Sequence, residues 1–347
     1  MKQPVMIKEI HEQPAALAKT LKQESKNVLA IAEAIRKYDP AFLVLVARGT
    51  SDNAATYAKY LFEYANGIPA VLAAPSIFTI YGKSANMKKS LVIGISQSGE
   101  GTDINEFLAD AQKQGAFTIG ITNTAGSAIT KAAGHSIMLR AGKENALAAT
   151  KTYTCQLLSL LMLSEALKNG KKGFDRLQSL PDEISKVLEV EPLIKELSCR
   201  YRYMEHSVII GRGMNYCTVK EAALKMMETS YVVAQPFSTA DFLHGPIAMA
   251  GVGFPVFIAN PSGVMAPQIN KLIADLGERR VETIVVSALK SALAKAEIPI
   301  ALNVDPEETI SPIHYIVPFQ FLACYISMSK GIDPDAPRYL KKVTRTR

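Results

Sequence analysis

The sequence repeats its own pattern after 164 residues, and this constrains the fold more than any other feature. A strand-like run starting at Val44 recurs at Val208, so the offset is 208 − 44 = 164. The segments that match at this offset are 44–49 with 208–213, Ser98-Gly99 with Ser262-Gly263, and 156–158 with 320–322. A fixed offset of this kind indicates two homologous units in tandem. A chain of 347 residues has room for two such domains.

Each half alternates short apolar runs with helical patterns. In the first half we expect strands near 43–47, 70–73, 91–95, 117–121 and 136–139, and helices near 6–37, 52–65, 102–114 and 149–168. Continuous apolar strands with helices between them indicate a parallel sheet that is covered on both faces. The predicted fold class is therefore α/β, with two tandem units of this kind. A linking helix is expected over 181–200.

The charge of the chain does not indicate a nucleic-acid surface. The net charge is +7, but residues 331–347 carry five Lys or Arg against two Asp, so +3 of it lies in this tail. A local anion pocket or a solvated tail accounts for this distribution better than an extended basic face. Neither a nucleic-acid partner nor a membrane is expected.

The cysteines and the apolar runs indicate a cytoplasmic protein. The four cysteines are widely spaced, without the clustered Cys and His of a zinc site, so no metal is expected. The first residues lack the apolar core of a signal peptide. The longest apolar run, near 157–163, is too short to span a bilayer.

A polar loop follows the predicted strand at 91–95. It reads Ser96-Gln97-Ser98-Gly99 and leads into a helical pattern. Ligands of open parallel sheets bind beyond the carboxyl ends of the strands, where helix N-termini and hydroxyl groups favour an anion. The hydroxyl pair Thr50-Ser51 is a second candidate for binding an anion, and Thr150 with Lys151 is a third. We therefore expect a site for the phosphate of a small molecule.

Two familiar phosphate-binding signatures are missing. The sequence has neither GxxxxGK[ST] nor a GxGxxG after the first strand, so no nucleoside triphosphate or dinucleotide cofactor is expected. In the second half, the loop 260–263 reads Asn-Pro-Ser-Gly. Because proline lacks an N–H group, this copy is expected to have lost the anion site.

The second half carries its own candidate chemistry. Lys225 precedes Glu228 by three residues, so both lie on one face of a predicted helix. His244 precedes Gly245-Pro246, which holds it in a rigid loop. A solvated ion-pair face is the alternative interpretation of Lys225 and Glu228.

Several motifs resemble the SIS, or sugar isomerase, domain family. The resemblance is greatest to the isomerase half of glucosamine-6-phosphate synthase and to the stand-alone glucosamine-6-phosphate deaminases and fructosamine deglycases. The matching words, in family order along nearly the whole chain, are ARGTS at 47–51, SQSGE at 96–100, ATKTYTCQL at 149–157, EAALKMMETSY at 221–231, LHGP at 243–246 and PRYLKKVT at 337–344. The fold that this resemblance implies is two tandem flavodoxin-like SIS domains.

The resemblance also implies roles for single residues. Glu228 would move a proton between C1 and C2, Lys225 would support the developing oxyanion, and His244 would help open the sugar ring in the partner subunit of a homodimer. Lys342 would contact the open-chain sugar, with a Schiff base as one alternative. The residues implied to bind the phosphate and nearby hydroxyls are Thr50, Ser51, Ser96, Gln97 and Ser98.

Three departures bear on the substrate. Gly101 stands where the synthases have threonine, which moves that hydroxyl to Thr102, and Ala149 replaces the serine before Thr150. The chain begins Met1-Lys2 with no N-terminal cysteine, and about forty residues precede the first strand, so we expect it not to hydrolyse glutamine. We predict an N-terminal helix and first domain over 1–190, a second domain over 191–330, and a basic tail over 331–347 that closes the active site.

The resemblance leads to one main hypothesis on function. It is the conversion of glucosamine 6-phosphate to fructose 6-phosphate and ammonia, without a cofactor. The alternatives are a deglycase of a 6-phosphorylated fructosamine and a non-catalytic sugar-phosphate sensor. No motif in the sequence separates the first two.

Overall fold

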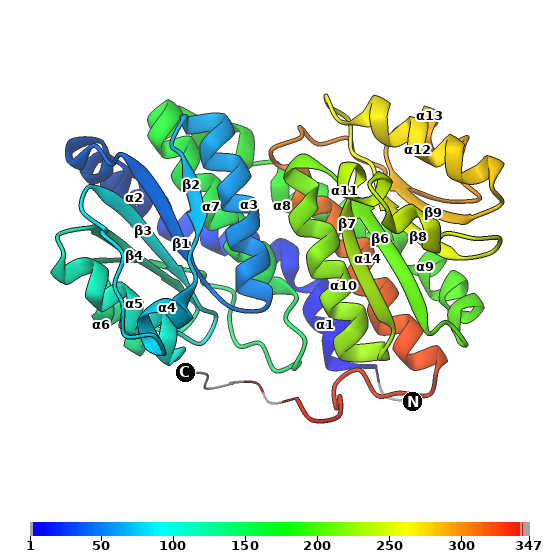
Figure 1. Cartoon of the computed structure of the whole chain (residues 1–347), viewed down its shortest axis with the longest axis horizontal. Helices are drawn as coiled ribbons and strands as arrows, with labels where there is room; N and C mark the ends of the chain where they lie inside the picture. The colour runs from blue at the N-terminus through cyan, green and yellow to red at the C-terminus, as the bar shows by residue number, and fades with distance from the viewer. Residues whose placement is uncertain (1–2, 341, 343–347) are drawn as a thin grey trace. The chain divides into compact units, whose positions relative to one another are not determined.

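The computed structural model describes residues 3–340 and 342. Two compact units make up this part of the chain, and each contains a five-stranded parallel sheet (Figure 1). The N-terminal unit comprises residues 13–144, 151–181 and Lys342. The C-terminal unit comprises residues 3–12, 145–150 and 182–340. The α/β class predicted from the alternating pattern is confirmed.

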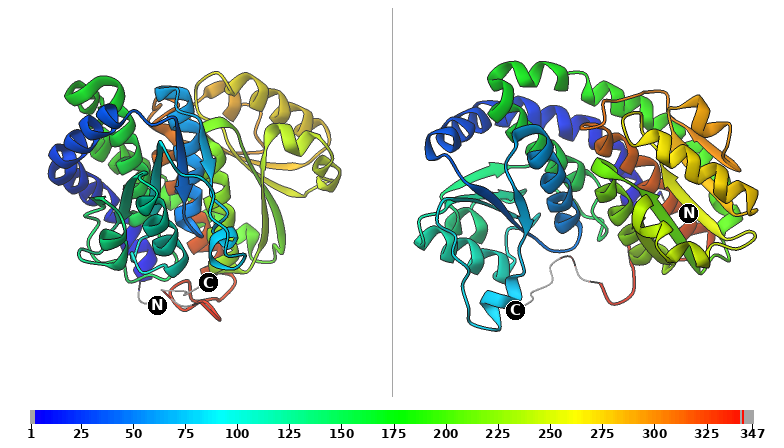
Figure 2. Two further views of the ribbon diagram at one scale, coloured as in Figure 1. Left: turned by 60° about the vertical axis from the view of Figure 1, so that its left-hand side comes forward. Right: turned by 45° about the horizontal axis from the view of Figure 1, so that its top comes forward.

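The N-terminal unit follows the predicted order of strands and helices. Its elements are α2 (Gln13–Tyr38), β1 (Phe42–Val46), α3 (Thr50–Asn66), β2 (Ala70–Leu72), α4 (Pro75–Thr79), β3 (Ser90–Ile95), α5 (Thr102–Lys113), β4 (Phe117–Thr122), α6 (Ala128–Ala132), β5 (His135–Met138), α7 (Lys151–Asn169) and a 3-10 helix (Gly170–Leu177). Helices α2, α3 and α7 pack together, and α4, α5 and α6 form a second layer. The sheet is therefore covered on both faces (Figure 2).

The C-terminal unit has the same architecture. Its helices and strands are α1 (Val5–His11), α8 (Leu180–Val187), α9 (Glu191–Ser198), β6 (His206–Gly211), α10 (Tyr216–Ser230), β7 (Val233–Ser238), α11 (Thr239–Leu243), β8 (Pro255–Ala259), α12 (Ala266–Glu278), β9 (Glu282–Ser287), α13 (Lys290–Leu293), β10 (Ile298–Ala301) and α14 (Ser311–Ser329). Short 3-10 helices lie at Leu188–Val190, Cys199–Tyr201, Gly213–Asn215 and Pro246–Met249. Helix α14 is buried from Ser311 to Ser327, because it packs against α1, α9 and α10.

The two sheets confirm the internal duplication. Their strand orders are β2-β1-β3-β4-β5 and β7-β6-β8-β9-β10, which are equivalent. The register is also shared, since Leu43 lies opposite Ala70 in the first sheet and Ser207 lies opposite Ala234 in the second. Both members of each pair differ by 164. Side-chain burial on a pleated sheet depends on register, so the two halves also place equivalent residues on equivalent faces.

The last helix of each half departs from this offset. Helices α7 and α14 begin at Lys151 and Ser311, which are 311 − 151 = 160 residues apart. The loop after β10 is shorter than the loop after β5, by nine residues against twelve. The match of 156–158 with 320–322 at an offset of 164 is therefore about one helical turn out of step with the helices.

Two helix predictions were wrong in their continuity. The segment 6–37 forms two helices, α1 and α2, with Glu12 between them. Pro14 explains the break, because it lacks the N–H group that a continuous helix would use. The segment 181–200 is likewise divided into α8 and α9, and Pro192 lies in the first turn of α9. None of the helices formed by the described residues combines the length and apolar character needed to cross a bilayer.

Candidate active site

The polar loop after β3 forms one wall of a cavity in the N-terminal unit. The loop is held in shape by its own hydroxyl groups, since Ser96 Oγ accepts from the Gly99 N–H at 3.1 Å and Ser98 Oγ accepts from the Glu100 N–H at 3.3 Å. Helix α5 begins at Thr102, directly after this loop. Its N-terminus therefore presents backbone N–H groups and partial positive charge beside the loop.

The cavity has a volume of about 320 Å³ and brings together most of the predicted phosphate ligands. Its lining residues are Arg48, Gly49, Ser51, Ile95, Ser96, Gln97, Ser98, Gly101, Asp103, Ile104 and Lys342. Two cations, Arg48 and Lys342, thus face the same space as Ser51 and the polar loop. An anion fits this combination of cations, hydroxyls and a helix N-terminus.

Three predicted ligands lie outside the lining of this cavity. Thr50 is the first residue of α3, and Thr102 is the first residue of α5. Thr150 is fully buried in the C-terminal unit, where its carbonyl accepts a hydrogen bond from Gln320 Nε2 at 3.4 Å. These residues shape the ends of helices, and their roles in binding sugar stay predictions.

Arg48 is a lining residue that the sequence reasoning did not single out. Its Nε donates to Oδ2 of Asp103 at 2.7 Å, and the Asp103 side chain is almost fully buried. This ion pair fixes the guanidinium group at the cavity wall. The available signal was the position of Arg48, which directly precedes the Gly-Thr-Ser that follows the first strand.

Glu144 is a second residue that the sequence reasoning missed. Its buried carboxylate accepts from the backbone N–H of Thr152 at 3.1 Å and from the Thr152 hydroxyl at 2.6 Å. Lys342 Nζ lies 3.5 Å from Oε2 of the same carboxylate. Glu144 therefore positions the Lys342 ammonium at the cavity. Of the predicted closing tail, 331–347, residues 341 and 343–347 lie outside the described part of the chain.

Gly99 cannot be replaced without disturbing the polar loop. Its φ is +72°, and an added Cβ would lie 2.1 Å from Ser127 Oγ and 2.9 Å from Thr122 Oγ1. If the cavity binds an anion, we expect Gly99→Ala to weaken binding of inorganic phosphate by at least about tenfold, because a positive φ and a steric clash together shift the loop. Isothermal titration calorimetry measures this affinity.

The matched control for Gly99→Ala is Gly67→Ala. Gly67 also has a positive φ, of +66°, but a Cβ there would meet nothing within 4 Å. This control carries the backbone strain without the clash and lies at the end of α3. Equal losses of affinity in the two variants would show that loop shape does not govern binding.

The equivalent loop of the C-terminal unit is occupied by acidic side chains of the protein itself. The Ser262 hydroxyl donates to Asp305, and the Val264 N–H donates to Glu308 Oε2 at 3.1 Å. A Cβ at Gly263 would lie 2.2 Å from the same Glu308 oxygen. Carboxylates at this position repel an incoming phosphate, which supports the prediction that the second copy has lost the anion site.

A buried lysine lies between two carboxylates on α10. Lys225 Nζ is 2.5 Å from Glu228 Oε2 and 3.3 Å from Glu221 Oε1. Lys225 and Glu221 are buried, whereas the side chain of Glu228 is 21% exposed. Burial alone would lower the pKa of Lys225, but the two carboxylates outweigh it and raise the pKa above its ordinary value. Lys225 is thus a cation that anchors a carboxylate reaching the surface.

Such an arrangement suits proton transfer. A carboxylate held beside a fixed ammonium can take a proton from a C–H group next to a carbonyl, and the ammonium stabilises the negative charge that develops. The alternative of a solvated ion-pair face does not fit, because Lys225 is only 1% exposed.

His244 lies at the C-terminal end of α11. Its backbone N–H donates to the Asp241 carbonyl at 3.2 Å, and the residue itself is exposed. Gly245 follows with a φ of +139°, and Pro246 begins the next 3-10 helix. His244 thus lies in an exposed connection between two short helices, and its role stays a prediction. Among the described residues, no group of His, Cys, Asp or Glu side chains could hold a metal ion.

Comparison with known sequences finds relatives that share one name and come from several organisms. The chain is 37% identical over 339 residues to the isomerizing glutamine–fructose-6-phosphate aminotransferase of Methanothermobacter thermautotrophicus, covering 97% of this chain and 56% of that protein. It is 36% identical over 349 residues to the enzyme of the same name from Thermococcus kodakarensis, covering 97% and 57%. The chain thus spans a little over half the length of these relatives.

Solved structures share the fold over almost the whole chain. The C-terminal domain of glucosamine-fructose-6-phosphate aminotransferase from Francisella tularensis superposes with a TM-score of 0.85 and 25% identity, covering 97% of this chain and 99% of that one. Glucosamine-6-phosphate deaminase from Thermotoga maritima superposes with a TM-score of 0.75 at 23% identity, covering 99% and 100%. The second likeness supports the fold alone.

A family model describes both halves of the chain. The SIS domain matches residues 38–166 and again residues 202–330, which are the segments that contain the two sheets. This confirms the tandem SIS architecture predicted from the motifs, and the chain belongs to the SIS domain family.

Proposed function

We propose that the protein converts a hexosamine 6-phosphate, glucosamine 6-phosphate in the first instance, to fructose 6-phosphate and ammonia. The observation that carries the proposal is the cavity in the N-terminal unit, where Arg48, Lys342 and the polar loop meet at the start of α5. A phosphate group satisfies these donors and cations, and a cavity of about 320 Å³ has room for a small sugar.

The Lys225–Glu228 pair supports the isomerase step of this proposal. Glu228 would take the proton from C2 of the open-chain amino aldose and return it to C1, which gives the imine of fructose 6-phosphate at C2. Water then hydrolyses this imine, so that the nitrogen leaves as ammonia and the C2 carbonyl of fructose 6-phosphate forms. Lys225 would stabilise the charge that develops on the enediol or enolamine. The relatives are named as isomerizing aminotransferases of fructose 6-phosphate, which supports a sugar phosphate as the substrate.

A substrate panel tests the proposal. Purified protein is mixed with glucosamine 6-phosphate, unphosphorylated glucosamine or a fructosamine 6-phosphate. Coupled assays measure ammonia, fructose 6-phosphate and glucose 6-phosphate, which is the sugar left when a fructosamine loses its C1 amine. We expect ammonia release from glucosamine 6-phosphate and none from glucosamine, because the phosphate supplies the binding energy. Faster turnover of the fructosamine would indicate the deglycase. Binding of fructose 6-phosphate without turnover of any amine would indicate a sensor.

Lys342 offers a direct test of the covalent alternative. A lysine amine attacks the open-chain carbonyl, loses water and forms an imine, which borohydride reduces to a stable secondary amine. We expect borohydride to attach the sugar phosphate to the wild-type protein and not to Lys342→Arg, which keeps the charge without a primary amine. Mass spectrometry reads the added mass. Lys113→Arg on α5 is the control, since Lys113 is exposed at the end of that helix.

Equal labelling of wild type and Lys342→Arg would place the imine on another lysine. No labelling of the wild type would leave Lys342 the role of a cation. In either case we expect Lys342→Arg to lower kcat/KM by at least about tenfold. The longer, planar guanidinium group cannot place a donor where the Lys342 amine lies, and a preorganised site depends on that position.

We also propose a homodimer in which His244 completes the site of the partner subunit. The proposal rests on the exposure of His244 and of the apolar side chains Leu243 and Met249, which are 50% and 47% exposed. Exposed apolar side chains beside a rigid loop are typical of an interface. We expect His244→Asn and Lys342→Arg, each weakly active alone, to regain activity when mixed, because a mixed dimer contains one intact site. Absence of any recovery in subunits shown to exchange would contradict it.

A further inference from the structure

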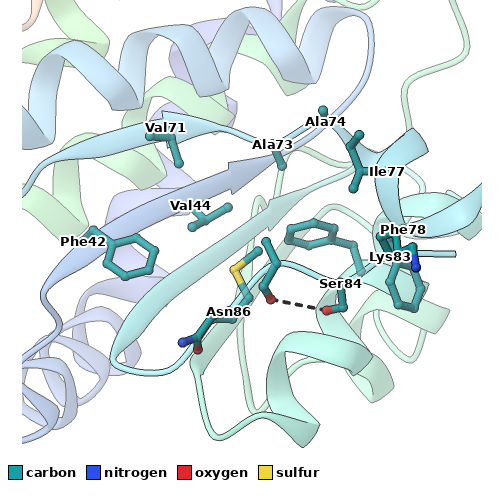
Figure 3. A pocket seen from close by; sticks show the side chains of 13 residues that line it. Phe42, Val44, Val71, Ala73, Ala74, Ile77, Phe78, Lys83, Ser84 and Asn86 are labelled. Atoms are coloured by element: carbon teal, nitrogen blue, oxygen red, sulfur yellow. Dashed lines mark hydrogen bonds between the residues drawn. The ribbon is translucent and has the colours of Figure 1, made fainter. Parts of the chain in front are cut away.

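A second cavity of the N-terminal unit plays no part in the proposed reaction. Its volume is about 300 Å³, and it lies at the edge of the sheet beside β1, β2 and α4 (Figure 3). Phe42, Val44, Phe78 and Phe107 contribute most of its aromatic and aliphatic wall. It shares no lining residue with the cavity at the polar loop.

In the C-terminal unit, side chains of the protein itself fill the region that corresponds to this cavity. Helices α4 and α11 are equivalent, since Pro75 and Thr239 differ by 239 − 75 = 164. In the C-terminal unit, Phe237 and Ile247 pack against the core at the corresponding edge. The residues 164 positions earlier are Ala73 and Lys83, and both line the cavity.

Phe78 and Phe242 are at equivalent positions of the two units, and they differ in burial. Phe242 is fully buried and contacts Phe237, with the ring centroids 5.8 Å apart. Its counterpart Phe78 is only partly buried. The N-terminal unit thus lacks one aromatic ring and one branched aliphatic side chain that the other unit supplies from its own sequence. A ring is therefore the shape that the empty space accepts.

Polar side chains also line the cavity. Figure 3 shows Lys83 next to Phe78, and Asn86 on the opposite side, toward Phe42. Ser84 is engaged with Asp110 and accepts from Gln114 Nε2 at 2.7 Å. Within residues 3–340 and 342, the Lys83 ammonium has no ion pair. A mostly apolar cavity that also has an unmatched ammonium in its lining suits an apolar ligand that carries one anionic group.

We propose that this cavity binds a small aromatic carboxylate, with its ring where Phe237 lies in the other unit and its carboxylate at Lys83. The inference does not depend on the proposed function, because the two cavities have separate walls. The preference for a ring follows because Ala73 stands at the position equivalent to Phe237. The preference for an anion follows from the ammonium group of Lys83.

Three probes of similar size and different charge test the proposal. Phenylacetate, benzyl alcohol and phenethylamine are titrated into the full chain, and binding is followed by ligand-observed NMR and calorimetry. We expect phenylacetate to bind more tightly than benzyl alcohol and phenethylamine not to bind. Lys83→Gln should weaken phenylacetate roughly two- to fivefold, as for other exposed ion pairs, and leave benzyl alcohol unchanged. Lys113→Gln is the charge-matched control.

The second part of the experiment uses a variant that carries the residue found at the equivalent position of the C-terminal unit. Ala73→Phe introduces the side chain found at the equivalent position 237, and it should abolish binding of both phenylacetate and benzyl alcohol. Turnover of sugar phosphate should not change, because Ala73 is not part of that site. If Ala73→Phe unfolds, as judged by circular dichroism, Ala73→Leu fills less space and serves the same purpose.

Several outcomes would overturn the proposal. They are the absence of binding by any probe at millimolar concentration, equal binding of the amine and the carboxylate, and undiminished binding in the filled variant. A change of oligomeric state in Ile77→Asp, without binding of any probe, would instead assign the cavity to a protein partner.

Discussion

Glu228→Gln is expected to lower kcat for ammonia release from glucosamine 6-phosphate by about a thousandfold, because a positioned acid–base group contributes 10²–10⁴ in rate. Glutamine keeps the length of the side chain and still accepts a hydrogen bond from Lys225, so the fold and KM should change little. Exchange of deuterium from solvent into C1 of fructose 6-phosphate, followed by NMR, should stop in parallel. A fall in exchange isolates proton transfer from amine release.

The control for this prediction is Glu278→Gln. Glu278 ends α12 and is exposed, so its substitution removes the same charge without touching Lys225. Wild-type rates of deuterium exchange in Glu228→Gln would rule out Glu228 as the base. The nearby buried carboxylate of Glu221 would then be the next residue to replace.

Lys225→Met should reduce the free energy of unfolding by about 3–5 kcal/mol, because removing one partner of a buried ion pair leaves a buried charge uncompensated. The carboxylate at issue is Glu221, which is fully buried and 3.3 Å from Lys225 Nζ. Urea unfolding followed by circular dichroism measures the change. Lys271→Met on α12 is the exposed control, and we expect it to change stability by less than about 0.5 kcal/mol.

A second substitution tells a charge effect from a packing effect. Adding Glu221→Met to Lys225→Met removes the buried carboxylate as well, so stability should recover in part. If the double variant is as unstable as Lys225→Met, lost packing accounts for the change.

The pH dependence of this pair follows from the sign of the shift. The pKa of Lys225 is raised in the folded protein above its ordinary value of 10.5. The stabilisation is therefore fully present below that value and is lost as the pH rises through the folded pKa. The difference between wild type and Lys225→Met should stay constant around neutral pH and shrink in strongly alkaline solution.

The succession of strands and helices along the chain and the polar loop after the third strand could be predicted because both depend on local patterns. Apolar runs bounded by glycine specify buried parallel strands, and Ser96 to Gly99 follow one of them directly. The repeat then extended the same reasoning to the second half. Breaks at Glu12 and near Pro192 were missed, because an amphipathic pattern continues across a proline that interrupts the hydrogen bonds.

Contacts between distant residues could not be predicted in this way. Glu144 meets Lys342 across 198 positions of sequence, and Arg48 meets Asp103 across 55. Neither pair has a sequence spacing that specifies it, because tertiary packing alone brings the partners together. The apolar cavity was invisible for the same reason: Ala73 and Lys83 are ordinary residues until they are set against Phe237 and Ile247.

The acidic side chains in the second loop have a consequence for ligand stoichiometry. Asp305 and Glu308 accept the hydrogen bonds that a phosphate group would otherwise accept in this loop. Their carboxylates therefore stand in for the phosphate in the C-terminal unit. Each chain should then bind one equivalent of sugar phosphate despite its two homologous domains. A second equivalent bound per chain, measured by calorimetry, would contradict this expectation.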